Sequence, residues 1–182
     1  SEFVIDWLVE NCYCINSQTD DRSESNKKLW QKNSFEAYIP KHRYSNFCTL
    51  PEAKIAALQA VKDYGFAILS DVPCEAGDIL KVISEFGFVR HTNYGPLFEV
   101  RTTVNANNLA FTNLGLGCHL DNPYRDPAPS IQLLHCLQSS TAGGEPILQD
   151  GFMAANLLRE ENQQHFDTLS QQWINYRFQD AN

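Results

Sequence analysis

The sequence predicts an α+β protein that is mainly β, a mostly antiparallel barrel or sandwich with helices packed on one side. Two observations predict this class. Helical patterns come first along the chain, and a strand-rich stretch follows them. The stretch shows no regular alternation of strands and helices, which argues against a Rossmann-type parallel sheet. Because 43% of the 182 residues are hydrophobic, the chain can bury the core of a globular domain.

A first long helix is expected to begin at about residue 50. Thr49 can act as its cap, Pro51 suits its first turn, and Glu52 completes the pattern of a capping box. Gly65 is expected to end the helix, since glycine favours the left-handed conformation found there. The apolar run 66–69 that follows predicts a buried strand.

The remaining elements follow from the same kinds of signal. Asp150 can cap a helical pair that spans about 151–171, because aspartate is a preferred residue at helix starts. A further helix is expected over 76–86, and strands are expected over about 98–104, 117–122, 130–138 and 146–150.

The chain divides into three parts by composition. Residues 1–14 predict a short helix, the tail of a small N-terminal domain, and residues 15–47 predict a polar linker with little regular structure. Residues 48–182 are expected to form the N-terminal portion of the barrel domain. Because the alternating segment 173–178 is typical of a strand that no further strand follows, the chain is expected to be a fragment, truncated at its C-terminus.

Composition excludes several classes of partner. With 14 basic against 22 acidic residues and a net charge of −8, the chain lacks the basic patch of a nucleic-acid-binding protein. No apolar run is long enough to span a bilayer, and the N-terminus lacks the layout of a signal peptide. The six scattered cysteines are interpreted as reduced thiols in a cytoplasm, with a secreted disulfide protein as the alternative.

The candidate for chemistry is the pair His119 and Asp121. If 117–122 is extended, side chains two residues apart lie on the same side, so the two would project together. An imidazole and a carboxylate are two of the three ligands in the 2-His-1-carboxylate triad that binds Fe(II) and leaves coordination positions open. A His-x-Asp sequence is common by chance, and the alternative is a surface pair on a loop.

Longer motifs surround this pair. In chain order they are NNLAFT at 107–112, HLDNPYRDP at 119–127, QLLHC at 132–136, Gly143-Gly144, and DGF at 150–152. In order and spacing they resemble the γ-butyrobetaine dioxygenase and taurine dioxygenase-like family of Fe(II)- and 2-oxoglutarate-dependent oxygenases. The resemblance implies a double-stranded β-helix (jelly-roll) barrel with flanking helices and with His119 and Asp121 as iron ligands. It also implies that Leu134 lies against the co-substrate 2-oxoglutarate, although an ordinary core position is the alternative for Leu134.

The family's second histidine ligand and its 2-oxoglutarate-binding arginine are expected beyond Asn182. His165 and Arg177 imitate the spacing of these two residues. We do not assign them, because His165 belongs to a polar helical stretch and follows Asp121 too closely to leave room for the intervening barrel strands.

The resemblance also implies a substrate site. Tyr94, Phe98 and Phe111 match the aromatic cage that holds a trimethylammonium group, a cation that aromatic faces attract. Asn108 matches the residue that contacts the substrate carboxylate. Asn122 stands where some relatives have an aromatic residue, which leaves the cage more open on one side. For each of the three aromatic residues, an ordinary core position is the alternative.

These expectations combine into a function. The carboxylate of Asp121 favours hydroxylation, because related halogenases lack a carboxylate at this position. The expected reaction uses Fe(II), 2-oxoglutarate and O2 to hydroxylate a small quaternary-ammonium acid, with γ-butyrobetaine, the precursor of carnitine, as the first candidate. The alternatives are trimethyllysine, an aminoethylphosphonate, or a metal-free barrel that acts as a binding module. A homodimer is a possible assembly, because an unclosed barrel would expose strand edges.

Overall fold

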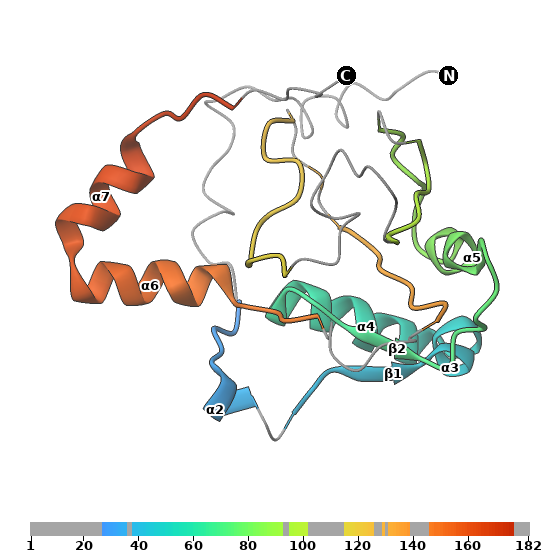
Figure 1. Cartoon of the computed structure of the whole chain (residues 1–182). Helices are drawn as coiled ribbons and strands as arrows, with labels where there is room; N and C mark the ends of the chain where they lie inside the picture. The colour runs from blue at the N-terminus through green and yellow to red at the C-terminus, as the bar shows by residue number, and fades with distance from the viewer. Residues whose placement is uncertain are drawn as a thin grey trace, which may run out of the picture.

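The structure, a computed structural model, describes residues 27–35, 38–92, 95–101, 115–125, 129, 131–138 and 146–176. The predicted helix at 1–14 lies outside these residues. In chain order the elements are α2 (Lys32–Phe35), β1 (Lys41–Arg43), α3 (Tyr44–Thr49), α4 (Pro51–Tyr64), β2 (Ile68–Ser70), α5 (Asp78–Ser84), α6 (Gly151–Glu161) and α7 (Gln163–Gln171). Figure 1 shows β1, β2, α3 and α4 together at the base, with α5 at one side and the α6–α7 pair at the other.

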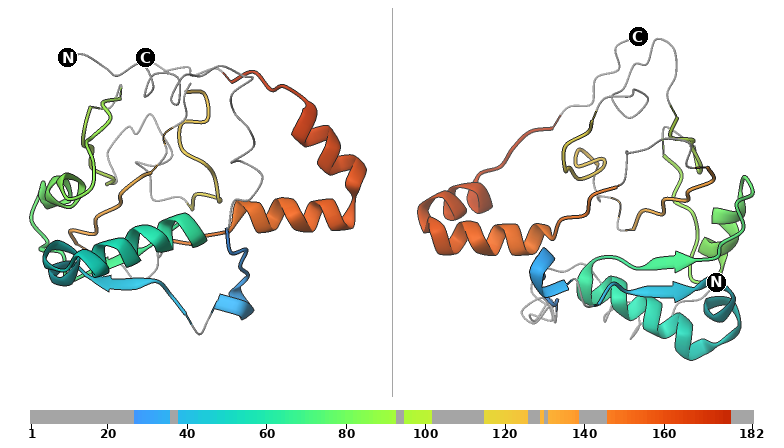
Figure 2. Two further views of the ribbon diagram at one scale, coloured as in Figure 1. Left: turned by 180° about the vertical axis from the view of Figure 1, so that it is seen from behind. Right: turned by 60° about the horizontal axis from the view of Figure 1, so that its bottom comes forward.

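The strands β1 and β2 form a parallel pair in which His42 lies opposite Leu69. Parallel strands cannot be joined by a tight turn, and α3 and α4 supply the crossover between them. Both strands run beside α4 in the second view of Figure 2. The expectation that 15–47 has little regular structure is therefore wrong for its described part, which contains α2, β1 and the start of α3.

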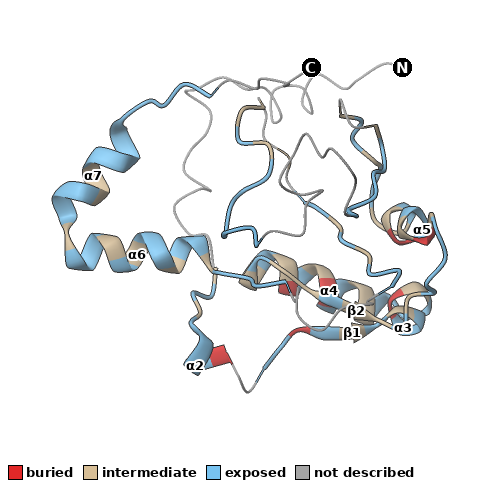
Figure 3. Cartoon of the chain, viewed as in Figure 1, coloured by how far each residue is buried: buried red, intermediate tan, exposed pale blue. Residues whose placement is uncertain are grey.

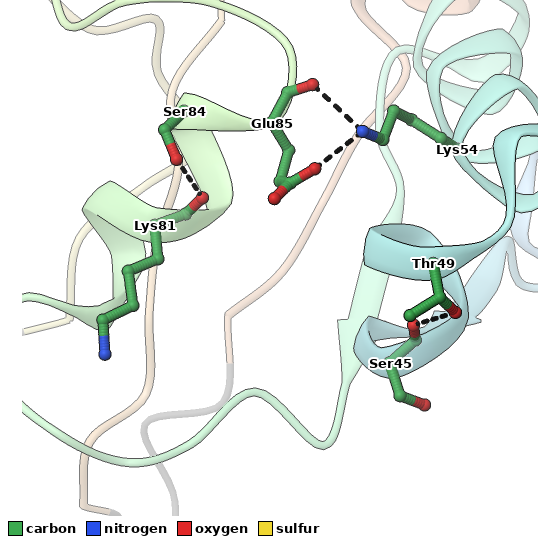
Figure 4. Close-up of polar contacts among 6 residues, drawn as sticks. All are labelled: Ser45, Thr49, Lys54, Lys81, Ser84 and Glu85. Atoms are coloured by element: carbon green, nitrogen blue, oxygen red, sulfur yellow. Dashed lines mark hydrogen bonds and ion pairs between the residues drawn. The ribbon is translucent and has the colours of Figure 1, made fainter.

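The predicted capping box at the start of α4 is also wrong. Thr49 is the last residue of α3, and its hydroxyl donates to the carbonyl of Ser45 at 2.8 Å (Figure 4). Leu50 takes the cap position without a side-chain hydrogen bond, and Pro51 occupies the first turn. The end of α4 is confirmed at Gly65, which has a φ of 85° and donates its N–H to the carbonyl of Val61.

A small core holds α3, α4 and α5 together. Its buried residues are Phe47, Ala57 and Val82, one from each helix, and Phe47 is only 2% exposed. Figure 3 shows buried positions on these three helices, on α2 and just before β1, whereas α6 and α7 have none. Leu133 packs against the core from a distant part of the sequence. The predicted strand at 66–69 is found at 68–70, and it is only partly buried because Ile68 is 41% exposed.

An ion pair fastens α5 to α4. The ammonium group of Lys54 lies 2.7 Å from Glu85 Oε2 and also donates to the Glu85 carbonyl at 3.3 Å (Figure 4). It also lies 5.7 Å from the centre of the Phe47 ring, where the aromatic face attracts a cation. The predicted helix at 76–86 is confirmed as α5, which is two residues shorter at each end.

The start of the described chain is bound to the beginning of α6. The backbone N–H of Trp30 donates to Asp150 Oδ2 at 2.9 Å, and the Trp30 indole donates to the Tyr64 carbonyl at 2.9 Å. Asp150 Oδ1 accepts from the backbone N–H groups of Phe152 and Met153, which confirms Asp150 as the cap of α6. The predicted helical pair is confirmed too, with Asn162 capping α7.

The later predicted strands are not observed. In the described parts of 98–104, 117–122, 130–138 and 146–150 no residue belongs to a strand, and β1–β2 is the only sheet that the described residues form. A strand needs a neighbour to receive its N–H and C=O groups, and none runs beside these segments in the part of the chain described. The jelly-roll barrel is therefore not seen in these residues. Within the same residues, no helix is long and apolar enough to cross a membrane.

Candidate metal centre

The segment 115–125, yellow in Figure 1, carries the predicted iron ligands. Its shape is set by a turn rather than by a strand. Asn122 has a left-handed φ of 51°, which asparagine tolerates better than most residues, and Pro123 follows it. The N–H of Arg125 donates to the Asn122 carbonyl at 3.1 Å, and the Tyr124 hydroxyl donates to Asn122 Oδ1 at 2.7 Å. The chain therefore turns directly after Asp121.

The structure brings His119 and Asp121 together as predicted. His119 Nε2 lies 3.1 Å from Asp121 Oδ1, and the two side chains are 48% and 41% exposed. The other ring nitrogen, Nδ1, lies 2.7 Å from the carbonyl oxygen of Gly117. A carbonyl oxygen only accepts, so this contact is a hydrogen bond in the tautomer that carries its proton on Nδ1. In that tautomer the unprotonated Nε2 faces the Asp121 carboxylate and can bind a metal, whereas protonation of both ring nitrogens makes the contact with Asp121 an ion pair.

The distance between these two atoms fits a metal ion. At bonds of roughly 2.1 Å, ligands on adjacent corners of an octahedron lie about 3.0 Å apart. The 3.1 Å separation of Nε2 and Oδ1 is close to that value, and it is also the length of a hydrogen bond between an imidazolium and a carboxylate. Their partial exposure also leaves space for other ligands. Among the described residues no group of three His, Cys, Asp or Glu side chains could hold a metal ion.

The structure describes two of the five predicted substrate residues, Phe98 and Asn122. Tyr94, Asn108 and Phe111 lie outside the described residues. Phe98 is described and is 48% exposed. Asn122 is half-buried, and its side chain is engaged with Tyr124. The sequence prediction missed this turn-forming role, although an Asn-Pro dipeptide is a known turn signal.

Leu134 lies in a different place from the metal pair. It is 70% exposed and lines a cavity of about 240 Å³ between β2, α5 and the segment 131–138. The wall is mostly apolar, with Gln132 and His135 as its polar members. Neither His119 nor Asp121 is among the described residues that line it. The prediction that Leu134 contacts 2-oxoglutarate therefore stays a prediction.

His165, which we did not assign as a ligand, is an exposed residue of α7, and its backbone N–H donates to the cap residue Asn162. Arg177 lies outside the described residues.

Comparison with known proteins identifies the family of this chain. Residues 27–181 match the family described as taurine catabolism dioxygenase TauD, TfdA. The chain therefore belongs to the TauD/TfdA family.

Curated relatives match along nearly the whole chain. It is 32% identical over 175 residues to a γ-butyrobetaine dioxygenase from Pseudomonas sp. (strain AK-1), covering 96% of this chain and 45% of the relative. It is 28% identical over 176 residues to the human γ-butyrobetaine dioxygenase, covering 97% of this chain and 46% of the relative. A mitochondrial trimethyllysine dioxygenase from Rattus norvegicus is 31% identical over 173 residues, covering 94% and 40%. The chain thus spans less than half the length of these relatives.

Proposed function

We propose that the full-length protein is an Fe(II)- and 2-oxoglutarate-dependent oxygenase that hydroxylates a small quaternary-ammonium acid. The observation that carries this proposal is the 3.1 Å separation of His119 Nε2 and Asp121 Oδ1, with Nδ1 of the same ring bound to the Gly117 carbonyl. Membership of the TauD/TfdA family supports the reaction type. The proposal includes a jelly-roll barrel, in which the later segments of this chain would find partner strands.

His119 and Asp121 would hold the iron as neighbouring ligands. When bound, the iron supplies the activation of O2, with 2-oxoglutarate as the co-substrate that is oxidised. The Gly117 carbonyl would keep the His119 ring turned so that Nε2 faces the metal position. The turn that starts at Asn122 would direct the chain away from that position directly after Asp121. Leu134 would contribute an apolar wall to the co-substrate site.

For the substrate we propose a quaternary-ammonium acid, with γ-butyrobetaine first. The relatives named γ-butyrobetaine dioxygenase and trimethyllysine dioxygenase support a trimethylammonium compound. Tyr94, Phe98 and Phe111 would surround the cation, because a trimethylammonium group donates no classical hydrogen bond and is held by aromatic faces. Asn108 would bind the carboxylate, and Asn122 would border the cage. A primary amine such as an aminoethylphosphonate would prefer carboxylate or carbonyl partners to a set of aromatic rings.

Trimethyllysine is the second candidate, favoured by the relative from Rattus norvegicus that is 31% identical. The two candidates share the cation and differ in the group at the far end, which carries an α-amino group as well as a carboxylate in trimethyllysine. Substitution of Asn108 should therefore change the preference between them more than substitution of a cage aromatic.

The test is turnover by the full-length protein. Succinate formed from 2-oxoglutarate would be measured with Fe(II) and O2 in the presence of γ-butyrobetaine, trimethyllysine or 2-aminoethylphosphonate. We expect the first to raise succinate formation most and His119→Ala to abolish it. His165→Ala is the matched control, since it removes an exposed imidazole from α7 and should leave turnover unchanged. Equal loss in both variants, or no succinate with any of the three compounds, would contradict the proposal.

The compartment and the assembly are also proposals. For the compartment we propose the cytoplasm, because a chain of this length with an ample core does not need disulfides for stability. Association into a homodimer stays a prediction, and sedimentation of the full-length protein would test it. A nucleic-acid partner is not proposed, because the net charge is −8.

A further inference from the structure

We propose that Cys74 and Cys136 form a thiol–disulfide switch that locks the segment 131–138 onto the loop between β2 and α5. The inference does not rest on the proposed oxygenase function, because it concerns two thiols and can be read out chemically. It starts from a contact between residues 62 positions apart. The thiol of Cys74 donates to the backbone carbonyl of Cys136, with 3.9 Å between the sulfur and the oxygen.

This contact sets an upper limit on the distance between the two cysteines. A carbonyl oxygen lies about 2.4 Å from the Cα of its own residue. The Cys74 sulfur is therefore within roughly 6 Å of the Cα of Cys136, and the two Cα atoms are within roughly 9 Å of each other. A disulfide requires Cα atoms about 4.4 to 6.8 Å apart, so closure requires side-chain rotation together with a backbone shift of up to about 2 Å.

The surroundings allow that shift. Cys74 lies in the loop between β2 and α5, and none of the described residues of 131–138 belongs to a helix or strand. Closing the bridge therefore breaks no ladder or helical hydrogen bond in the described residues. Leu133, which packs against the core, already holds the segment close to β2 and α5. The packing of Leu133 would therefore keep Cys136 near the loop that carries Cys74 before the bridge forms.

Both thiols can also react with a solute. Cys74 and Cys136 are exposed free thiols, whereas Cys48 is half-buried in the helix α3. Cys118 is exposed too, which makes it the matched reference for a thiol that is accessible without this partner. Oxidation to a disulfide should thus be selective for Cys74 and Cys136 because these two thiols lie near each other, since Cys118 is also exposed.

The oxidant is a low-molecular-weight disulfide such as glutathione disulfide. The thiolate of Cys74 attacks one of its sulfurs, forming a mixed disulfide and releasing one glutathione thiolate. The thiolate of Cys136 then attacks the Cys74 sulfur, which forms the protein disulfide and releases the second glutathione thiolate. The two protein thiols lose two electrons, the glutathione disulfide gains them, and the two thiol protons pass to the released thiolates. An excess of reduced glutathione reverses both steps.

Closure has a defined structural consequence. Gln132, Leu133, Leu134 and His135 form one wall of the cavity of about 240 Å³, and β2 and α5 form the other. The bridge would attach the segment 131–138 to the loop between β2 and α5. The width of the cavity would therefore depend on the redox state of the two cysteines. Reduction would release the wall.

The test is a redox titration of the full-length protein with peptide mapping. Trypsin cleavage after Lys62, Lys81, Arg101, Arg125 and Arg159 places Cys74, Cys118 and Cys136 in the separate peptides 63–81, 102–125 and 126–159. The protein would be equilibrated at increasing ratios of glutathione disulfide to glutathione, alkylated and digested without reduction. We expect peptides 63–81 and 126–159 to appear cross-linked, with a loss of ~2 Da relative to the two thiol forms and a joint loss of alkylation. Peptide 102–125 should remain alkylated over that range.

Variants distinguish the pair from general oxidation. Cys118→Ser should leave the cross-link unchanged, whereas Cys136→Ser should abolish it and leave a glutathione adduct on Cys74. The proposal is overturned if wild-type Cys74 and Cys136 each acquire glutathione without a cross-link at any ratio. It is also overturned if either cysteine pairs with Cys12, Cys14 or a second copy of the chain. Because the readout is on the wild-type chain, a variant that folds poorly does not remove the test.

Discussion

Asp150 is expected to be the most important single carboxylate for attaching the start of the described chain to the α6–α7 pair. One oxygen accepts the N–H groups of Phe152 and Met153 at 2.9 and 3.1 Å, and the other accepts the Trp30 N–H at 2.9 Å. Asp150→Ala removes both sets of contacts. Loss of a helix cap costs about 1 kcal/mol. Loss of a partly buried hydrogen bond to a charged group costs roughly 1.5 kcal/mol more. We therefore expect the free energy of unfolding to fall by about 2 to 3 kcal/mol.

Two variants separate these contributions. Asn162→Ala removes a cap that serves α7 alone, through the N–H of His165, and should cost only about 1 kcal/mol. Asp150→Asn keeps an oxygen that can cap α6 but removes the charge, so its cost should lie between those of the two alanine variants. Urea unfolding followed by tryptophan fluorescence and by circular dichroism measures all three.

Either of two results would contradict a coupling of the α6–α7 pair to the rest of the chain through Asp150. If Asp150→Ala costs no more than Asn162→Ala, the Trp30 hydrogen bond contributes nothing beyond an ordinary cap. If the fluorescence and dichroism transitions separate in the wild type, α6 and α7 unfold independently of the core, and the contact does not couple them.

Three further outcomes are expected from the core and from the ion pairs. Phe47→Ala should lower the free energy of unfolding by about 3 to 5 kcal/mol, because a fully buried ring is lost from the contact between α3, α4 and α5. Lys54→Ala should cost about 1 kcal/mol in urea unfolding, because its ion pair with Glu85 is only partly exposed and its ammonium lies against Phe47. A hydrogen bond from Lys28 holds the pKa of Asp63 below its ordinary value. The stabilisation from that depressed pKa is present above the unfolded-state pKa of about 4 and is lost as the pH falls through the lower folded-state pKa.

Each of these outcomes can fail in a specific way. A Phe47→Ala cost below that of Lys54→Ala would show that the buried cluster does not dominate the stability of this region. For Asp63, the matched variant is Asp63→Asn, and urea unfolding would be compared between pH 7 and pH 2. The wild type should lose its advantage over the variant as the pH falls, and a constant difference across that range would contradict the effect.

Local signals in the sequence were sufficient where a helix is defined by its own residues. Gly65 ends α4 because its left-handed φ suits a glycine, and Asp150 caps α6 because its carboxylate reaches the first free N–H groups. Thr49 carried the same kind of signal but failed as a cap, because the helix α3 before it uses the hydroxyl for a bond to Ser45. The competition between two adjacent helices for one side chain is not visible in a capping pattern.

Strands were predicted poorly because they depend on partners that are distant in sequence. The strand β1 reads Lys41-His42-Arg43, which has no apolar alternation, and it exists because Ile68–Ser70 lies beside it. The segment 131–138 has strand-like composition and no ladder partner among the described residues. In both cases the presence or absence of a neighbouring strand, more than the β-propensity of the residues, determined whether a strand formed.

The proximity of His119 and Asp121 was expected from a strand geometry that the structure does not show. Side chains two residues apart do converge at His119 and Asp121, but the segment is not a strand and the turn at Asn122 shapes it. The hydrogen bond from His119 Nδ1 to Gly117 could not be predicted, because it depends on the local path of the backbone.

We propose that His119 and Asp121 hold an iron that binds 2-oxoglutarate. The most direct measurement is anaerobic optical spectroscopy of the full-length protein with Fe(II) and 2-oxoglutarate, in which chelation by the co-substrate gives a metal-to-ligand charge-transfer band. We predict a band in the wild type and in His165→Ala, no band in His119→Ala, and a shift of the band when γ-butyrobetaine is added. A wild-type protein without a band, or a band that survives His119→Ala unchanged, would contradict the assignment of this pair as the iron site.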